Sequence, residues 1–469
     1  MDLSPEACSL AVILAVVVVA WVTEILPLPV TALAGAAACV VAGVAPMREV
    51  FRPFADPLIF LFIGSFMLAE AIRVHRLDRR LAFAVLALPA VGERPGRVLA
   101  AVAAVSATIS AFISNTATTA MMTTIALGIL AAVEDAGSAE ADGARRRPGR
   151  TWATGLLLAV AFGASIGGLA TPIGTPPNVI GLGLIRRELA VEISFLRWCA
   201  IGVPVAVILT ALAVLLLGRL FPAGVDRLHG VAELVARQRA TMGRWTVGQA
   251  STAGAFAVTV ILWVLPGILG LVLGKGHPLP TLLADRVPEG VAALVGAILL
   301  FVLPGGPGRK ALSWSEAAAI DWGIILLYGG GMALGELSFS TGLAEAIGRG
   351  LTAYLPAEAG TAGLVVAASV VAALTSEFTS NTASANMVVP VAISLARAAG
   401  AEALPVALAA TFAASLGFMM PVSTPCNAIV YGTGRIRLGD MIRAGLFLDV
   451  AGTAIIAAAL ITAGRFFWG

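Results

Sequence analysis

The sequence predicts an all-α membrane protein that crosses the bilayer many times and consists of two inverted five-span repeats. Hydrophobic residues make up 59% of the 469 residues and charged residues only 12%, whereas soluble domains have roughly 45–50% and 25%. The mean hydropathy is +0.96. Two stretches, 98–133 and 151–185, contain no Asp, Glu, Lys or Arg. Each is longer than the roughly 20 residues that one span needs.

The first elements are expected to be ordinary spans. Apolar runs near 7–25, 28–46 and 55–72, and a later one near 193–218, have the length of a transmembrane helix. The residues before the first run lack the basic region of a cleaved signal peptide, so we expect this helix to be retained. Asp56 followed by Pro57 is typical of an N-cap and a first helical residue.

The two long uncharged stretches predict irregular elements. The first holds Ser114, Asn115 and Thr116 near its middle, and the second holds the sequence TPIGTPPN at 171–178. Irregular backbone at membrane depth is tolerated only where it is buried in protein or lines a cavity. We therefore predict a re-entrant helical hairpin at about 96–133 and a broken helix at about 151–185.

The second half repeats this plan. Ser380, Asn381 and Thr382 restate the triplet, and TPCN at 424–427 matches TPPN at 175–178. The separation of Asp321 from the second triplet is nearly that of Asp56 from the first, and a polar insert at 134–150 accounts for the longer later spacing in the first half. The prediction is a first repeat at 1–218 and a second at 247–469, with a hairpin at about 360–397 and a broken helix at about 403–434.

Charge placement predicts the topology, because Lys and Arg concentrate in cytoplasmic loops. The linker 219–246 is basic and is expected in the cytoplasm, together with the insert that holds Arg145, Arg146 and Arg147. An odd number of spans in each half inverts one repeat relative to the other. The pair Arg186 and Arg187 fits this scheme least well, since it falls on the opposite side.

Several classes of function are disfavoured. The net charge of +3 is spread over loops, so no nucleic-acid partner is expected. The chain is not expected to be an enzyme. Its three histidines fall in polar connections, and the spans contain neither a nucleophile paired with a general base nor a set of metal ligands. An ion channel is also disfavoured, because two hairpins around one site suit alternating access.

The predicted architecture suits an anionic substrate. Each helix N-terminus carries roughly half a positive charge, and inverted repeats with broken helices place substrate and coupling ions near the bilayer midplane. The predicted hairpin centres and broken helices contain no Lys or Arg. Helix termini and polar groups would therefore hold the anion.

Several of these motifs together resemble those of a known family. The paired Ser-Asn-Thr triplets, GTPPN at 174–178, PVSTPCN at 421–427 and WVTEILPLP at 21–29 together resemble the divalent anion:sodium symporter family, which includes the INDY-type dicarboxylate and citrate carriers. The resemblance covers nearly the whole chain. It differs at Cys426, which stands where Pro177 stands in the first half, and in beginning at what is usually the second helix.

The resemblance implies a set of site residues. One sodium site would use Ser110, Ser114 and Asn115 with a carbonyl near Gly174. Its counterpart would use Ser376, Ser380 and Asn381 with carbonyls near Ser423 and Pro425. The substrate carboxylates would be bound by a set that partly overlaps these sites: Ser114, Asn115, Thr116, Thr175, Ser380, Asn381, Thr382 and Thr424. Glu377, an intramembrane acid without a counterpart in the first half, is left open between a functional and a structural role.

The resemblance also implies the activity. We expect a homodimeric secondary carrier in the bacterial inner membrane that imports a C4-dicarboxylate such as succinate, malate or fumarate with two or more sodium ions. Moving one charge through 100 mV is worth about 2.3 kcal/mol, so a dianion would oppose about 4.6 kcal/mol, which two sodium ions would cancel. A sodium-independent exchanger, or a carrier of citrate or sulfate, remains the alternative.

Overall fold

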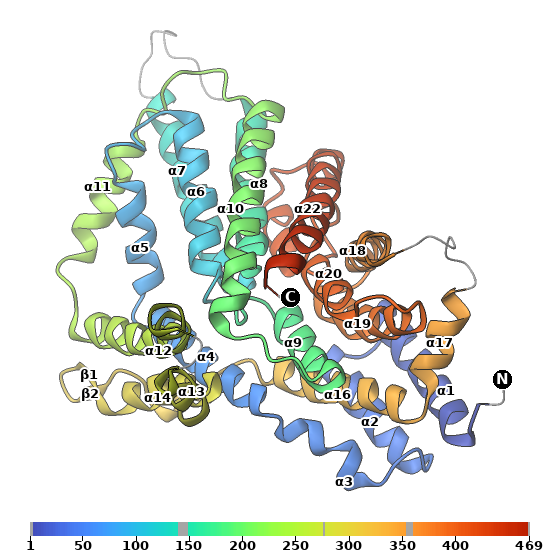
Figure 1. The fold of residues 1–469 in the computed structure, drawn as a ribbon. Coiled ribbons are helices and arrows are strands. Elements are labelled where there is room, and N and C mark those ends of the chain that lie inside the picture. The colour runs from blue at the N-terminus through green and yellow to red at the C-terminus, as the bar shows by residue number, and fades with distance from the viewer. Residues whose placement is uncertain (1–2, 139–148, 275–276, 353–359, 468–469) are drawn as a thin grey trace.

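The computed structural model describes residues 3–138, 149–274, 277–352 and 360–467, and these form an almost entirely helical protein (Figure 1). A short antiparallel pair, β1 (Pro304–Gly306) and β2 (Arg309–Lys310), is the exception within that part of the chain. The arginines at 145–147 of the polar insert lie outside the described residues.

In the first half, long helices alternate with shorter ones. Helix α1 is capped by Ser4, whose hydroxyl accepts from the Ala7 amide, and α4 is capped by Asp56, which accepts from the Leu58 amide. The bounds are α1 (Pro5–Thr23), α2 (Leu28–Val41), α3 (Met47–Val50), the 3-10 turn η1 (Arg52–Ala55), α4 (Pro57–Val74), α5 (Leu77–Leu86), α6 (Pro95–Ser110), α7 (Asn115–Ser138), α8 (Arg150–Gly168), α9 (Pro176–Leu189) and α10 (Phe195–Leu220).

The linker forms one amphipathic helix, and the second half then runs through a comparable series. The bounds are α11 (Val231–Met242), α12 (Val247–Leu273), α13 (Pro278–Arg286), α14 (Glu289–Val302), α15 (Trp314–Ala317), α16 (Trp322–Ser340), α17 (Leu343–Thr352), α18 (Thr361–Phe378), α19 (Asn381–Ala398), α20 (Ala403–Ala413), α21 (Pro425–Tyr431) and α22 (Leu438–Phe467).

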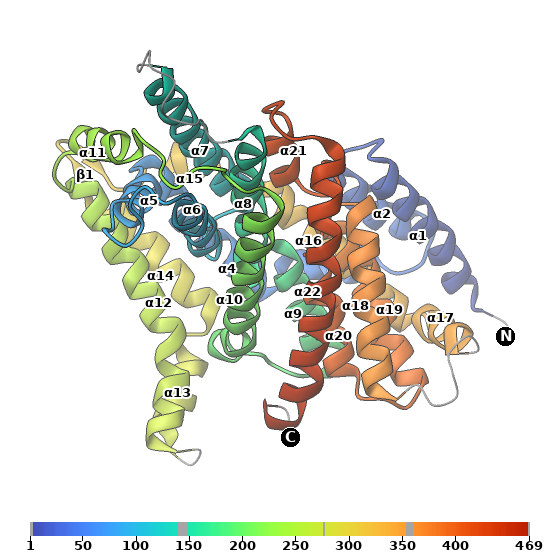
Figure 2. The same ribbon diagram turned by 90° about the horizontal axis from the view of Figure 1, so that it is seen from above.

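Corresponding helices of the two halves have corresponding neighbours. Helix α6 packs on α8 as α18 packs on α20, and α10 and α22 lie side by side near the middle of the molecule (Figure 2). The halves also exchange partners, because α14 packs on α4 while α2 packs on α16. The repeat boundaries and the inversion of one half relative to the other stay predictions.

Length and composition fit a membrane protein. Nine helices in the described ranges are long and apolar enough to cross a bilayer, and α2, α6, α14 and α20 are shorter apolar helices. The most apolar window of α8 is 94% buried, whereas that of α12 is 11% buried. Helix α8 therefore lies at the centre of the molecule and α12 at its edge, as Figure 2 shows.

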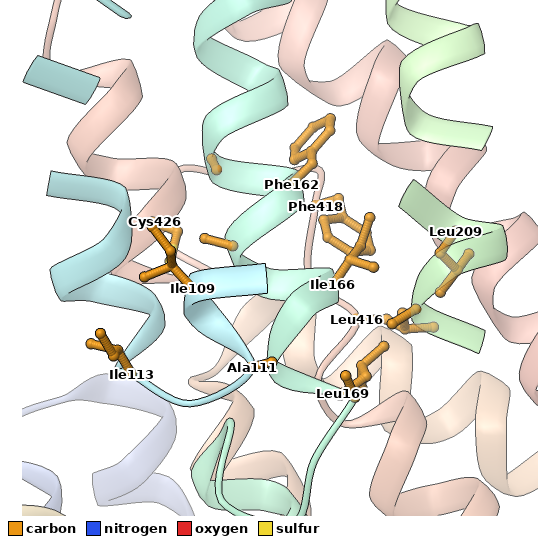
Figure 3. Close-up of a cluster of buried hydrophobic side chains, with 14 of the residues drawn as sticks. Ile109, Ala111, Ile113, Phe162, Ile166, Leu169, Leu209, Leu416, Phe418 and Cys426 are labelled. Atoms are coloured by element: carbon orange, nitrogen blue, oxygen red, sulfur yellow. The ribbon is translucent and has the colours of Figure 1, made fainter. Parts of the chain in front are cut away.

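The core between the halves forms around the non-helical segments that follow α8 and α20. The rings of Phe162 in α8 and Phe418 in the second segment meet edge to face at 5.2 Å, as seen in Figure 3. Trp198 of α10 stacks on Phe412 of α20 at 4.4 Å. This packing joins the interrupted helix of each half to the other half.

Candidate functional site

Each Ser-Asn-Thr triplet lies at the start of a helix. Ser114 directly precedes α7, and Ser380 is the N-cap of α19, with its hydroxyl accepting from the Ala383 amide at 3.1 Å. The first four amides of a helix have no partner within it and carry partial positive charge. Ser114 and Thr116 are exposed, while Ser380, Asn381 and Thr382 are half-buried. Both triplets are thus accessible at a helix start.

The structure brings the predicted serine and asparagine together in both halves. The hydroxyl of Ser110 lies 2.6 Å from the side-chain amide of Asn115. In the second half, the hydroxyl of Ser376 donates to Asn381 Oδ1 at 2.7 Å. Both serines are fully buried. The same serine–asparagine contact therefore forms at the start of both α7 and α19.

Backbone oxygens complete the surroundings of Asn115. The amide atom that faces Ser110 is also 3.2 Å from the carbonyl oxygen of Gly174 and 3.3 Å from that of Ala164. An amide nitrogen at this position donates to these oxygens. An amide oxygen there would instead form a cluster of four oxygens, which is the ligand type that a hard cation prefers.

In the second cluster, the carbonyl oxygens of Ala414 and Ser415 lie beside the predicted side chains. Ser376 Oγ faces the Ala414 carbonyl oxygen at 2.8 Å, and Asn381 Nδ2 donates to the Ser415 carbonyl at 3.4 Å. The hydroxyl of Ser423 donates to a Glu377 carboxylate oxygen. The roles of Ser423 and Pro425 as sodium ligands remain predictions.

Close approach of backbone to side chain requires glycine at one position in each half. A Cβ on Gly168 would lie 2.8 Å from Asn115 Oδ1 and 3.1 Å from the Cβ of Thr175. A Cβ on Gly417 would lie 3.2 Å from Asn381 Oδ1. These glycines bring the end of the preceding helix, or the segment after it, against the triplet.

The segments 169–175 and 414–424, which we call break 1 and break 2, separate α8 from α9 and α20 from α21. Thr175 is the N-cap residue of α9, and Thr424 is the N-cap residue of α21. The Thr424 hydroxyl accepts from the Asn427 amide at 3.1 Å. Both threonines are buried and are the last residues of their breaks.

Two asparagines hold the breaks, and the prediction gave neither of them a role. Asn178 Nδ2 donates to the carbonyls of Gly168 and Thr171 at 2.9 and 2.8 Å. Asn427 Nδ2 donates to those of Gly417 and Met420 at 3.0 and 2.9 Å. Both side chains are fully buried. Both asparagines occupy the fourth position of the duplicated motifs TPPN and TPCN, and this repetition could have identified them.

Glu377 holds break 2 in a way that has no equivalent in break 1. Its carboxylate accepts from the amides of Met419 and Met420 at 2.8 and 3.1 Å and from the Ser423 hydroxyl at 2.6 Å. The corresponding residue in the first half is Ala111, whose carbonyl accepts from a threonine hydroxyl in break 1. Glu377 therefore shapes the backbone beside the second triplet.

An ion-pair network that includes buried Asp56 joins the end of α9 to α4 and α16, and it was also missed. Asp56 accepts two hydrogen bonds from Arg186, at 2.7 and 2.6 Å, and one from the Tyr328 hydroxyl at 3.2 Å. Arg187 pairs with Glu336 of α16. Asp56 is thus both the predicted N-cap and the centre of a network between interrupted and continuous helices.

Two surface cavities lie away from the triplets. A cavity of about 390 Å³ lies where α5 meets the end of α11, and one of about 630 Å³ lies between α7, α8 and the segment after α21. Neither is lined by a triplet residue. A common void between the two triplets stays a prediction.

Comparison with known proteins covers the whole chain. The family described as "Sodium:sulfate symporter transmembrane region" matches residues 1–469. An uncharacterized transporter of Haemophilus influenzae is 31% identical, with 100% of this chain and 93% of that protein covered. The sodium-dependent dicarboxylate transporter SdcS of Staphylococcus aureus is 29% identical, with 93% of this chain and 82% of SdcS covered.

Solved structures of two other transporters share the fold. The Alcanivorax borkumensis YdaH transporter aligns with a TM-score of 0.58 at 17% identity, over 89% of this chain and 87% of that one. Neisseria gonorrhoeae MtrF aligns with a TM-score of 0.56 at 12% identity, over 87% and 82%. At these identities the likeness concerns the fold alone.

Proposed function

This chain belongs to the sodium:sulfate symporter family, the divalent anion:sodium symporters that its motifs predict, and from that membership we propose that it imports a small dianion together with two or more sodium ions. It is a multi-span transporter of the plasma membrane and not an enzyme. The proposal concerns the substrate, the ions and the way in which access alternates.

The substrate class is a C4-dicarboxylate such as succinate, malate or fumarate. Two relatives named as sodium-dependent dicarboxylate transporters, from Staphylococcus aureus and Staphylococcus saprophyticus, are 29% and 30% identical to this chain, which supports that class. The exposed hydroxyls of Ser114 and Thr116 and the half-buried second triplet offer polar contacts to two carboxylates. Helix N-termini add positive potential without a fixed cationic side chain.

The observation that carries the proposal is the duplicated cluster of serine, asparagine and backbone carbonyl oxygens. Ser110 with Asn115, and Ser376 with Asn381, present side-chain oxygens next to the carbonyls of Gly174 and of Ala414. Neutral oxygens of this kind suit a hard cation such as sodium. If the Asn115 amide rotates, its oxygen takes the place of its nitrogen beside these carbonyls. Asn115 could then bind a cation instead of donating hydrogen bonds.

Two such sites match the charge of the substrate. Two sodium ions neutralise a dianion, which removes the roughly 4.6 kcal/mol that the bare anion would oppose at 100 mV. In this proposal the hairpins and interrupted helices of each protomer of a homodimer move together against the remaining helices. The ion pairs from α9 to α4 and α16 lie between these parts.

The test is uptake of labelled succinate, citrate and sulfate into proteoliposomes under sodium, potassium or proton gradients. We expect succinate to accumulate only with a sodium gradient directed inward. Preference for citrate or sulfate would change the substrate class. Uptake that needs substrate inside the vesicle and no sodium would replace symport with exchange.

A further inference from the structure

A cationic cavity lies between α5 and α11, which pack side by side at one edge of the molecule (Figures 1 and 2). Its volume is about 390 Å³. Arg80 and Leu81 of α5 line one part of it, and Arg239 of α11 lines another, together with Gly243 and Trp245 in the turn that leads into α12. None of these residues belongs to the proposed transport site.

Arg80 is held in this cavity by neutral groups. Its Nη2 donates to the carbonyls of Met242, Gly243 and Arg244 at 2.8, 2.8 and 3.0 Å. Its guanidinium carbon lies 5.5 Å from the centre of the Trp245 ring. Within the described residues, Nε is buried without an acceptor and Nη1 has no hydrogen bond. The guanidinium therefore keeps donors for an anion.

Acids do not neutralise the surroundings of the cavity. Helix α5 and residues 231–246 together contain five arginines and two acids. One of the acids, Glu233, lies 3.9 Å from Arg237 on α11 itself. In the part of the chain that the structure describes, no ion pair joins an acid to Arg80, Arg239 or Arg244. The excess positive charge attracts an anion to this face.

The cavity lies at the level where two candidate spans end. Helix α4 ends at Val74, and α12 begins at Val247, two residues after Trp245. The side chain of Gln249, in the first turn of α12, donates to the carbonyl of His75 just beyond α4, at 3.0 Å. The most apolar window of α12 is 11% buried, which leaves most of that helix to lipid. The cavity therefore lies beside the headgroup region of the bilayer.

The cavity also has exposed apolar walls. Leu81 is 47% exposed and Trp245 is 53% exposed. Tryptophan is enriched at membrane–water interfaces, and basic clusters on amphipathic helices beside a span attract anionic lipids. A soluble anion would use the arginines alone. A phospholipid would use the arginines with its phosphate and the apolar side chains with its acyl chains.

From this geometry we propose that the cavity between α5 and α11 binds the headgroup of an anionic phospholipid, with the phosphate at Arg80 and Arg239. The acyl chains extend along Leu81 and the lipid-exposed surface of α12. This site is separate from both triplets, so the proposal goes beyond the transport function and does not depend on the substrate. The bound lipid ties α11, which connects the two halves, to α5 in the first half.

The test measures lipid binding to the full-length protein in a neutral detergent. Native mass spectrometry gives the dissociation constant of the first bound lipid for phosphatidylglycerol, which is anionic, and for phosphatidylcholine, which has no net charge. Wild type should bind phosphatidylglycerol more tightly. In Arg239→Gln, which removes one exposed arginine, phosphatidylglycerol binding should weaken about fivefold, the effect of one arginine near a membrane surface. Equal affinities for the two lipids in wild type, or an unchanged affinity in Arg239→Gln, would overturn the proposal.

Arg237→Gln is the matched control. It removes the same charge from the same exposed helix surface, but Arg237 does not line the cavity. This variant should bind phosphatidylglycerol as wild type does. A loss as large as that in Arg239→Gln would show a general attraction to positive charge and no site in the cavity.

A second arm separates a lipid headgroup from a free phosphate. Inorganic phosphate and glycerol phosphate lack acyl chains, so a hundredfold excess of either over phosphatidylglycerol should not displace the bound lipid. Displacement by either compound would assign the cavity to a soluble anion and overturn the lipid assignment. Trp245→Ala, which removes an apolar wall, should weaken phosphatidylglycerol binding, and unchanged binding would contradict the proposed place of the acyl chains.

Discussion

Break 1 and break 2 share their neutral contacts and differ in buried charge. At each break, one asparagine amide donates to two carbonyls in or next to the segment, and nearby one serine of α6 or α18 contacts the asparagine of the triplet. Only break 2 is also held by a carboxylate, Glu377. The comparison teaches that the same backbone geometry is used twice, while charge has been added once.

The N-terminal caps of α4 and α16 also differ in buried charge, but here the buried charge lies in the first half. Asp56 is 4% exposed and is paired with Arg186, whereas Asp321 is exposed and accepts from the Ile324 amide of its own helix. Charge is therefore buried at the cap in the first half and at the break in the second. Each of the following substitutions compares one residue with its counterpart.

The largest effect is expected at the triplet asparagines. Asn115→Ala and Asn381→Ala each remove a side-chain oxygen from one proposed sodium site, so both should abolish sodium-dependent succinate uptake in proteoliposomes while the purified protein remains monodisperse. Wild-type uptake in either variant would refute the equivalence of the two clusters.

The next effect concerns the two caps. Asp56→Ala leaves half-buried Arg186 without its partner and should lower the free energy of unfolding by about 1.5–3 kcal/mol, the range for hydrogen bonds to a charged group. Asp321→Ala removes an exposed cap and should cost about 1 kcal/mol. Thermal unfolding in detergent measures both, and equal losses would contradict the contrast drawn between the caps.

A smaller and equal loss is expected at the two break asparagines. Asn178→Leu and Asn427→Leu keep side-chain volume but leave two backbone carbonyls without donors, at about 1–3 kcal/mol for an unsatisfied buried group. Unfolding should be shifted by a similar amount in both variants. A strong effect in one half alone would show that the two asparagines contribute unequally to stability despite their matching geometry.

The smallest effect is expected at the glycines. A methyl group at Gly168 would approach Asn115 Oδ1 to 2.8 Å, closer than the 3.2 Å between a methyl group at Gly417 and Asn381 Oδ1. Gly168→Ala should therefore cost about 1–3 kcal/mol through overpacking and should raise the sodium concentration for half-maximal uptake. The change for Gly417→Ala should be smaller, and the reverse order would contradict the geometry.

The sequence predicted the family, the helical class and the position of both triplets, because these follow from local patterns. Asp56 was recognised as a cap from the proline after it, but its pairing with Arg186 was not, since the two residues are far apart in the chain. Arg186 instead counted against the predicted topology. The partner of a charged side chain is set by packing, which periodicity does not report.

Other site residues were indicated less clearly by the sequence. Asn178 and Asn427 stood in the duplicated motifs, yet their partners are backbone carbonyls whose positions depend on how the breaks fold.

The exchange of partners between α2, α4, α14 and α16 has a consequence for biogenesis. While the ribosome is still translating the linker, α4 lacks the helix that will cover it, and α2 has no neighbour from the later half. A nascent chain halted there exposes helix surfaces shaped for protein rather than lipid. Packing of the first half is therefore completed only by helices of the second half.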